Sequence, residues 1–501
     1  MRFLVTLVLL GALPSLARAE DKPLAFDVQQ LATDGEVRHV EAADLDGDGK
    51  LDLVVATVIG EDEQAQRLFA IFWNQGDHFS TKPDLVLPAP SDLCVYDLAD
   101  VDGKPGAEML VVTPNGVRAI SFVGRAASPP KDLVSQATIF ARAPREQLPR
   151  FKLVHALGAN KVDEMLVPGP SSLSVYSRAG EAWSKRAELA IEVEETVDVP
   201  PREERDRTLS GLPAFSVSTS FPVMHVVDLN GDGLPDLALV HEDEIRAFIQ
   251  APDGTFPPKP TWLHSFNVRA KEKGSDNSPQ IHISLTDVDG DGRADAVITR
   301  QVNEGITSAT TTALVYLGTP GGFHDTPDQT IHSDGASFAG VQLVDVTGDG
   351  KPDLLMPSVK IGLFSIVRML TSKSIKVVWQ LYPMGTNHRF APKPTADRDM
   401  VLKLDLEGHT DMQAIDMDGD YDGDGQRDLA FGTDADELSL YKGGASGDLF
   451  ADEPMAKVPV RAFGQLLAVP LDGGKRTDLV LWYPGTRGHK KEIAVVRAKL
   501  K

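Results

Sequence analysis

One nine-residue pattern occurs five times along the chain and limits its possible folds more than any other feature. Each copy has Asp at positions 1, 5 and 9, an oxygen-bearing side chain at position 3, and Gly at positions 4 and 6. Such oxygens, a backbone carbonyl at position 7 and glycines that let the chain curl form the cage that a hard cation such as Ca²⁺ prefers. The repeat therefore predicts both a metal and a repetitive architecture.

We predict four metal-ligating side chains in each copy, at positions 1, 3, 5 and 9. The predicted ligands are Asp44, Asp46, Asp48, Asp52, Asp228, Asn230, Asp232, Asp236, Asp287, Asp289, Asp291, Asp295, Asp345, Thr347, Asp349, Asp353, Asp420, Asp422, Asp424 and Asp428. Asn230 and Thr347 replace an Asp at position 3, which lowers the charge of the ligand set in those two copies. We expect about five Ca²⁺ sites, with lower affinity at these two.

The pattern begins like an EF-hand loop, but that interpretation fails a direct test. An EF-hand needs a Glu at position 12 and a helix on each side. Position 12 is apolar in every copy, and the residues found there are Val55, Leu239, Ile298, Met356 and Phe431. Short apolar runs such as 223–227 and 237–240 flank the loops and are typical of buried strands. Each loop is therefore predicted to join two strands as a hairpin.

Three weaker copies lie in the gaps between the five strong ones. The copy at 100–108 has Lys104 at position 5, where an ammonium would repel a metal ion. Another lies near residue 156, and the last keeps Asp472 and Asp478. All three are predicted to keep the hairpin shape without the ion. Together the copies define eight units of roughly sixty residues, which is the size of a propeller blade.

These loops resemble the FG-GAP/VCBS repeat family, whose members fold as β-propellers of the integrin α-subunit type with calcium loops in a blade hairpin. The resemblance covers most of the chain after residue 19 and implies an all-β fold with a single propeller. Integrin-type propellers usually have seven blades, whereas the repeat count here favours eight. The segment 23–28 offers a spare strand, and the last unit stops after its third strand, 492–496. Pairing these segments would close the ring and remove both exposed sheet edges.

Two long spacings between copies predict insertions near 192–220 and 360–411. The first is charged and contains proline, so we expect a surface loop. The second mixes apolar and polar stretches, and we expect a decorated edge or an extra strand pair. Several units also place Phe after a Gly-containing turn, and we predict that these side chains lie in the core between blades. They are Phe79, Phe256, Phe323 and Phe450.

The first residues have the features of a secretory signal. Arg2 precedes an apolar run at 3–10, and small residues at Ala17 and Ala19 fit a cleavage site. The run is shorter than the ~20 residues needed to span a bilayer. We therefore expect a signal peptide at 1–19 and a propeller at 20–501. The mature protein is predicted to be secreted or periplasmic, monomeric and not inserted in a membrane.

Composition excludes some partners and one kind of stabilisation. The formal net charge of −23 argues against nucleic acid and anionic membranes as partners. Cys94 is the single cysteine, so no intramolecular disulfide can form. We predict that Cys94 is packed as a small buried hydrophobic residue.

No catalytic motif stands out, so we predict no catalytic residues and no cofactor other than Ca²⁺. The sequence has no Gly-x-Ser-x-Gly elbow, His-Glu-x-x-His pair or Walker loop. The first hypothesis is a non-enzymatic binding protein for a protein or glycan partner. The second is a calcium-dependent, lyase-like enzyme acting on extracellular polysaccharide. The third is a lectin, although its expected repeated aromatic residues are missing, because the five Trp residues do not recur at one position of the repeat.

Overall fold

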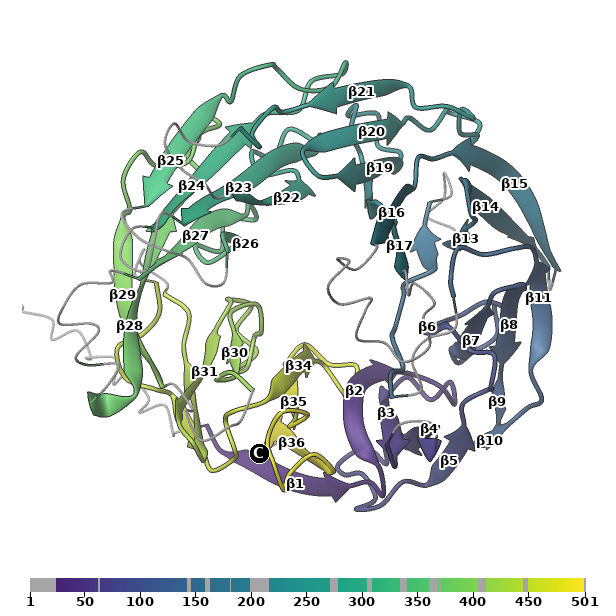
Figure 1. Cartoon of the computed structure of the whole chain (residues 1–501). Coiled ribbons are helices and arrows are strands. Elements are labelled where there is room, and N and C mark those ends of the chain that lie inside the picture. Colours follow the sequence, from purple (N-terminus) through teal and green to yellow (C-terminus); the bar gives the residue numbers. More distant parts are fainter. Residues whose placement is uncertain are drawn as a thin grey trace, which may run out of the picture.

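The chain forms a ring of eight four-stranded antiparallel sheets (Figure 1). The computed structural model describes residues 24–61, 64–141, 146–157, 163–180, 182–198, 216–270, 278–303, 309–333, 340–359, 368, 371–403, 411–444 and 449–499. Each sheet is one blade, with its first strand on the inner side of the ring. The prediction of an all-β propeller with eight blades is confirmed, and the alternative of seven blades is wrong.

Blades one to seven add their strands in chain order from the inside outward. Blade one contains β2 (Glu36–Ala43), β3 (Asp52–Ile59), β4 (Gln66–Phe72) and β5 (Leu85–Pro88); blade two contains β6 (Val95–Ala99), β7 (Glu108–Thr113), β8 (Gly116–Ile120) and β11 (Lys131–Ser135). Blade three contains β12 (Val154–Ala156), β13 (Asp163–Pro168), β14 (Ser172–Ala179) and β15 (Ala182–Ala190); blade four contains β18 (Val223–Val227), β19 (Asp236–His241), β20 (Glu244–Phe248) and β21 (Trp262–Ser265).

The remaining blades follow the same order, except at the end of the chain. Blade five contains β22 (Gln280–Thr286), β23 (Asp295–Asn303), β24 (Ala309–Tyr316) and β25 (Gln329–Ser333); blade six contains β26 (Gln342–Val344), β27 (Asp353–Ser358), β28 (Ser374–Tyr382) and β29 (Ala396–Lys403). Blade seven contains β30 (Ile415–Asp416), β31 (Leu429–Asp434), β32 (Glu437–Tyr441) and β33 (Ala456–Val458); blade eight contains β34 (Gln465–Val469), β35 (Asp478–Trp482), β36 (Glu492–Ala498) and β1 (Phe26–Ala32).

Blade eight is built from both ends of the chain. The N-terminal strand β1 pairs antiparallel with β36, from Phe26 opposite Ala498 to Ala32 opposite Glu492. This confirms the predicted closure, although the strand begins a few residues later than the predicted segment 23–28. Because β1 supplies the outer strand that the C-terminal segment lacks, the ring closes without leaving a three-stranded blade.

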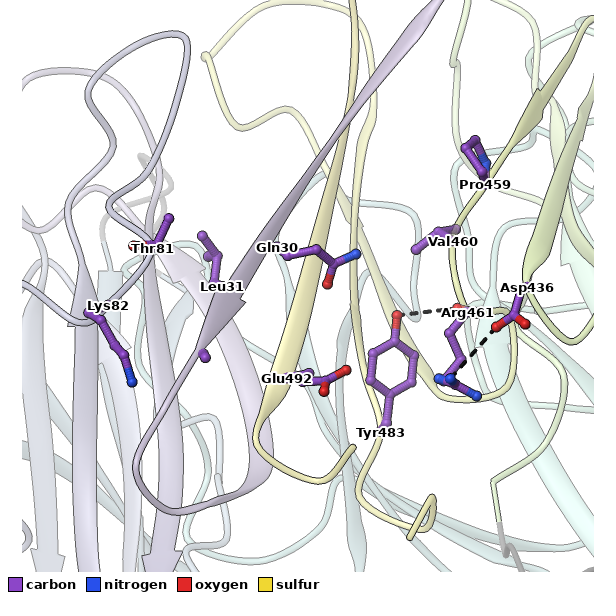
Figure 2. A pocket seen from close by; sticks show the side chains of 11 residues that line it. Gln30, Leu31, Thr81, Lys82, Asp436, Pro459, Val460, Arg461, Tyr483 and Glu492 are labelled. Carbon is purple, nitrogen blue, oxygen red and sulfur yellow. Dashed lines mark hydrogen bonds and ion pairs between the residues drawn. The ribbon is translucent and has the colours of Figure 1, made fainter. Parts of the chain in front are cut away.

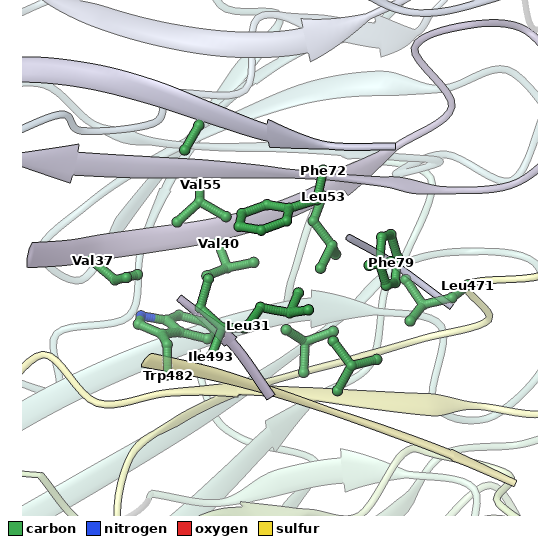
Figure 3. Close-up of a cluster of buried hydrophobic side chains, with 13 residues drawn as sticks. Leu31, Val37, Val40, Leu53, Val55, Phe72, Phe79, Leu471, Trp482 and Ile493 are labelled. Atoms are coloured by element: carbon green, nitrogen blue, oxygen red, sulfur yellow. The ribbon is translucent and has the colours of Figure 1, made fainter. Parts of the chain in front are cut away.

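The core lies in the seams between neighbouring blades. Eight clusters of buried apolar side chains join each blade to the next. Figure 3 shows the seam between blades eight and one, where Trp482 and Ile493 face Val40, Val55 and Phe72. Both faces of a blade are covered in this way, which explains why second strands such as β3 are apolar at almost every position.

Several predictions about single residues can be compared with the structure. Phe79, Phe256 and Phe450 are buried in seams, and Phe323 packs against one, so their predicted role in the inter-blade core is confirmed. Cys94 is a buried free thiol, as predicted. The predicted signal peptide lies outside the described residues. Within the described ranges, no helix is long and apolar enough to cross a membrane.

The two predicted insertions turn out differently. Much of 360–411 is not an insertion, because it contains β28 and β29, the outer strands of blade six. The sequence was misleading there because the third and fourth strands lie unusually far from the loop at Asp345. In the other segment, β16 (Glu194–Asp198) pairs with β17 (Ser216–Ser220) as an additional hairpin on the inner side of the ring (Figure 1). A second short hairpin, β9 (Phe122–Val123) with β10 (Ala126–Ala127), leaves blade two.

Candidate metal centres

The five Asp-rich loops occupy the same place in their blades. Each one connects the innermost strand to the second strand, as the hairpin interpretation predicted. The innermost strand of every blade runs toward the same face of the ring before it enters its loop. The loops therefore lie together on one face of the propeller, which we call the loop face. The three weaker copies connect the same strand pairs in blades two, three and eight.

The position-1 carboxylate curls each loop around itself. In blade one, Asp44 Oδ1 accepts the N–H of Gly47 at 2.8 Å, and Oδ2 accepts the N–H of Gly49 at 2.9 Å. The same two bonds recur from Asp228, Asp287, Asp345 and Asp420. The glycines at positions 4 and 6 have positive φ throughout, for example 75° at Gly47 and 86° at Gly49. Only glycine enters that region at little energetic cost, which explains the pattern.

The position-9 carboxylate ties each loop to its blade. Asp295 is 1% exposed; its Oδ2 accepts the N–H of Val288 at 2.9 Å and its Oδ1 accepts the N–H of Gly318 at 2.8 Å. Val288 is position 2 of the same loop, whereas Gly318 follows the third strand of the blade. Equivalent pairs of bonds are formed by Asp52, Asp236, Asp353 and Asp428. Position 9 thus has a structural role that the ligand prediction did not include.

Burial makes a negative charge on these position-9 carboxyl groups unfavourable unless a positive charge lies nearby. Desolvation raises the pKa of Asp52, Asp236 and Asp428 to about 6 and that of Asp295 to about 7. Neighbouring carboxylates of the same loop raise the pKa further, while backbone N–H donors oppose the shift. A bound cation would compensate this negative charge and favour the ionised form.

The structure brings three carboxylates within 4.8 Å of one another in three of the five strong loops. These groups are Asp44 with Asp46 and Asp48, Asp287 with Asp289 and Asp291, and Asp420 with Asp422 and Asp428. The loops starting at Asp228 and Asp345 do not form such a group, since Asn230 and Thr347 supply no carboxylate. In blades one and five the position-9 Asp lies outside the close group. These all-oxygen sets have the chemistry that hard cations select.

Basic side chains contact the position-3 carboxylate of each of these three groups. Arg125 Nε, from the turn between β9 and β10, lies 2.7 Å from Asp46 Oδ2. His388 Nδ1 of blade six lies 3.0 Å from Asp289 Oδ2 in blade five. Lys442 Nζ lies 2.5 Å from Asp422 Oδ2, and the two neighbouring carboxylates raise the pKa of this ammonium. Sequence reasoning missed all three contacts, because nothing in the repeat marks these partners.

Neighbouring loops also interlock around the face. The backbone carbonyl of position 1 accepts an N–H from position 8 of the next loop at 2.7 Å in three seams, namely Ala107 to Asp44, Ala294 to Asp228, and Thr477 to Asp420. The position-4 glycine faces the next loop as well. A Cβ built on Gly47 would lie 2.7 Å from the Pro105 Cβ, whereas one on Gly49 would meet nothing within 4 Å. Position 4 therefore needs glycine both for its φ and for the close approach.

The second blade keeps a carboxylate group although its copy is weak. Asp100, Asp102 and Glu108 lie within 4.8 Å of one another. Lys104 Nζ, at position 5, lies 2.8 Å from Asp102 Oδ2. The loop thus keeps its shape, as predicted, with an ammonium of the chain beside its carboxylates. In blade three the corresponding loop falls largely on residues 158–162, which lie outside the described ranges.

Comparison with known proteins supports the repeat assignment. Residues 228–298 and 287–356 match the FG-GAP-like repeat family. Each match begins at one strong loop and ends in the strand that follows the next strong loop. No curated protein matches the chain. Both matched segments lie in the part of the ring formed by blades four to six.

Solved structures resemble the chain over most of its length at low identity. A lectin of Agrocybe aegerita that recognises non-reducing terminal N-acetylglucosamine is 13% identical, with a TM-score of 0.40, covering 95% of this chain and 96% of that chain. The biofilm matrix protein Bap1 of V. cholerae is 10% identical, with a TM-score of 0.34 and coverage of 93% and 88%. BBS1N, solved in complex with ARL6DN, is 12% identical, with a TM-score of 0.33 and coverage of 82% and 93%.

TM-scores this low carry no functional information, so the assignment rests on the repeats and on the observed ring. The matched residues contain three of the five strong loops. All five share one hydrogen-bond pattern and one place in their blades. The chain is therefore an eight-bladed β-propeller in which residues 228–356 match FG-GAP-like repeats.

Proposed function

We propose that this protein is an exported, calcium-loaded β-propeller that acts as a non-enzymatic binding protein for a protein or glycan partner. The observation that carries the metal part is the set of three carboxylate groups within 4.8 Å on the loop face. Their donors are all oxygens, and the Asp-rich loops hold them in repeated backbone geometry. Calcium binds well at flexible sites made of oxygen ligands, whereas Mg²⁺ demands near-ideal octahedral geometry.

The ions in this proposal stabilise the ring and perform no chemistry. Each loop connects two strands at the inner end of a blade and contacts the next loop, so a cation bound there holds neighbouring blades together. Asp44, Asp287 and Asp420 would each contribute one oxygen. The position-9 residue anchors the loop in blades one and five, whereas in blade seven Asp428 is itself a member of the carboxylate group. A ligand that binds only the folded state stabilises it by mass action, by about 2.7 kcal/mol at 100 times its dissociation constant.

If the loop face holds metal ions, the surfaces left for a binding partner lie elsewhere on the propeller. The clustered carboxylates are then ligands and are not free for acid–base catalysis. The opposite face carries the turns between second and third strands and the connections between blades, which vary in length along the chain. Variable loops on a rigid scaffold are common places for recognition. Export is supported by the signal-like residues 2–19.

Thermal unfolding with a metal count tests this proposal. The full-length mature protein is melted in EDTA and in millimolar Ca²⁺, and bound calcium is counted in the folded sample. We expect a large calcium-dependent rise in the melting temperature with about five ions bound, and a smaller rise with Mg²⁺. An unchanged melting temperature with no bound calcium would show that the loops are hairpin connectors only.

A further inference from the structure

A cavity of about 650 Å³ opens beside the seam that closes the ring. Its lining comes from blade seven, from both chain ends in blade eight, and from the first blade (Figure 2). The volume lies within the roughly 300–1,000 Å³ of small-molecule sites. Asp436 lies in the turn after β31 and Tyr483 directly follows β35. Since both strands run away from the metal loops, the cavity lies on the opposite face.

The polar lining offers hydrogen-bond donors and acceptors without a net charge. Arg461 and Lys82 are balanced by Asp436 and Glu492. The Arg461–Asp436 pair is loose, with 3.7 Å between nitrogen and oxygen, and Lys82 lies 3.7 Å from Asp34. A guanidinium has five N–H donors and a carboxylate about four acceptor sites, so these groups keep capacity for a ligand. Figure 2 shows Gln30 and Glu492 near the Tyr483 ring, with Arg461 beyond it.

A firm apolar base supports these groups. Leu31 and Val460 are buried, at 1% and 3% exposure, and Pro459 adds apolar surface. Tyr483 is 1% exposed, and its hydroxyl donates to the backbone carbonyl of Arg461 at 3.2 Å. This bond fixes the connection that carries Arg461 against the end of β35. The cavity therefore combines positioned polar groups with an apolar surface, as ligand sites usually do.

We propose that this cavity binds an uncharged carbohydrate, such as a terminal sugar of a glycan. Sugar hydroxyls both donate and accept hydrogen bonds, so they can use the carboxylates and the cationic groups together. The C–H face of a sugar ring can pack on the exposed Pro459. Strongly anionic polymers are disfavoured because the lining has no net positive charge and the chain has a formal charge of −23. The inference rests on the proposed binding function and makes its glycan option specific.

Saturation-transfer NMR and calorimetry on the calcium-loaded full chain can test the site. The probes are the methyl glycosides of glucose, galactose and mannose, with glucuronate and glycylglycine as an anionic and a zwitterionic comparator. Arg461→Ala removes donors, and Glu492→Gln changes charge with almost no change in volume. Lys376→Ala is the matched control, because Lys376 pairs with Asp399 on the exposed outer edge of blade six. Calcium-dependent melting is recorded for every variant.

We expect at least one neutral glycoside to bind with a dissociation constant on the order of 1 mM. Binding should weaken at least tenfold in Arg461→Ala and Glu492→Gln and stay unchanged in Lys376→Ala. The inference is overturned if no neutral glycoside binds, if only a charged comparator binds, or if both cavity variants bind like the wild type. Loss of calcium-dependent melting would instead contradict the proposed metal function, so the two failures are distinguishable.

Discussion

The loops of blades two and five share two hydrogen bonds that shape the hairpin, although blade two has Pro105 at position 6 and Glu108 in place of Asp at position 9. In both, the position-1 Asp accepts the N–H of the position-4 glycine at 2.6 Å, and the position-9 carboxylate accepts the N–H of position 2 at 2.9 Å. At position 5, however, blade five has Asp291 and blade two has Lys104. Positions 1, 4 and 9 thus shape the hairpin, while positions 3 and 5 decide how much charge remains for an ion.

Blade eight extends this comparison to a loop that keeps even fewer acids. Asp478 still accepts the N–H of Leu471 at 3.1 Å, so the position-9 tie survives. Arg497 of β36 donates to the Gly76 carbonyl at 2.6 Å, and its positive charge lowers the pKa of Asp478 against the larger effect of burial. A basic residue of the chain therefore supplies part of the positive charge that an ion would supply in a strong loop.

The largest expected effect is the loss of one metal site from a strong loop. Asp289→Ala removes a carboxylate that is 3% exposed and central to the group in blade five. We expect it to remove most of the calcium stabilisation of that site, about 3–4 kcal/mol if the ion is at 100 to 1,000 times its dissociation constant. Denaturant unfolding with and without Ca²⁺ measures this.

The matched control for that site is Asp102→Ala in blade two. Asp102 holds the same position but lies 2.8 Å from the Lys104 ammonium. Its replacement should change the calcium-dependent stability by less than about 1 kcal/mol, the range of an exposed ion pair. Equal calcium-dependent losses in the two variants would contradict the distinction between strong and weak loops.

A somewhat smaller effect is expected from the pH dependence of blade eight. Burial, helped by Asp472, raises the pKa of Asp478 to about 6, above its usual 3.8. The contribution of Asp478 to folding stability is therefore fully present below pH 3.8 and is lost as the pH rises through about 6. The shift corresponds to roughly 3 kcal/mol. Urea titrations at pH 4.5 and 7.5 measure the fall in stability. Asp478→Asn should remove the part of this fall that Asp478 contributes, whereas Asp472→Asn should leave most of that part. The buried carboxyl groups of Asp52, Asp236, Asp295 and Asp428 contribute to the fall in both variants.

The interlocking of loops predicts a difference between two glycines of one loop. Gly49→Ala should cost about 1 kcal/mol, because its φ is 86° but its surroundings are open. Gly47→Ala should cost about 1–2 kcal/mol more, since the added Cβ meets the Pro105 Cβ, carbonyl carbon and oxygen within 2.9 Å. Urea unfolding of both variants in EDTA measures the difference free of calcium. Equal losses would show that the neighbouring loop yields without cost.

The smallest expected stability change comes from repairing the weak loop. Lys104→Asp restores an acid at position 5 beside Asp100, Asp102 and Glu108. The folded protein should then bind one more calcium ion, with a gain of about 1 kcal/mol at calcium concentrations a few times the dissociation constant. Elemental analysis after gel filtration gives the count, with Lys104→Ala as control. An unchanged count would mean that position 5 is not what separates the two loops.

Much of the fold was predictable because its determinants are local and periodic. The strong Asp-rich copies mark the turn between two strands, and the weaker copies near residues 100, 156 and 470 keep enough of the pattern to complete eight units. The spare strand before Glu36 and the missing fourth strand after Glu492 predicted ring closure. The extent of blade six was not predictable from the sequence. A long segment separates β27 from β28, so the third and fourth strands lie farther from their Asp-rich loop than those of the other units.

The candidate sites divide in the same way. The close approach of three carboxylates in three of the strong loops follows from spacing alone, since a nine-residue loop brings its own side chains together. The contacts of Arg125 and His388 with those loops do not, because each partner lies far away in sequence and carries no periodic mark. The cavity was even less predictable from the sequence, since Gln30 and Glu492 meet there only because β1 pairs with β36.

By itself, the sequence determined the repeat, the loop chemistry and the number of blades, because glycine φ preferences, carboxylate spacing and strand patterns act within a few residues. Only the tertiary structure decided which loops interlock, which basic groups face the carboxylates, and where the cavity opens beside the closing seam. These features depend on how blades are rotated and packed against each other. That arrangement follows from the eight inter-blade cores as a whole, so no single segment of the chain specifies it.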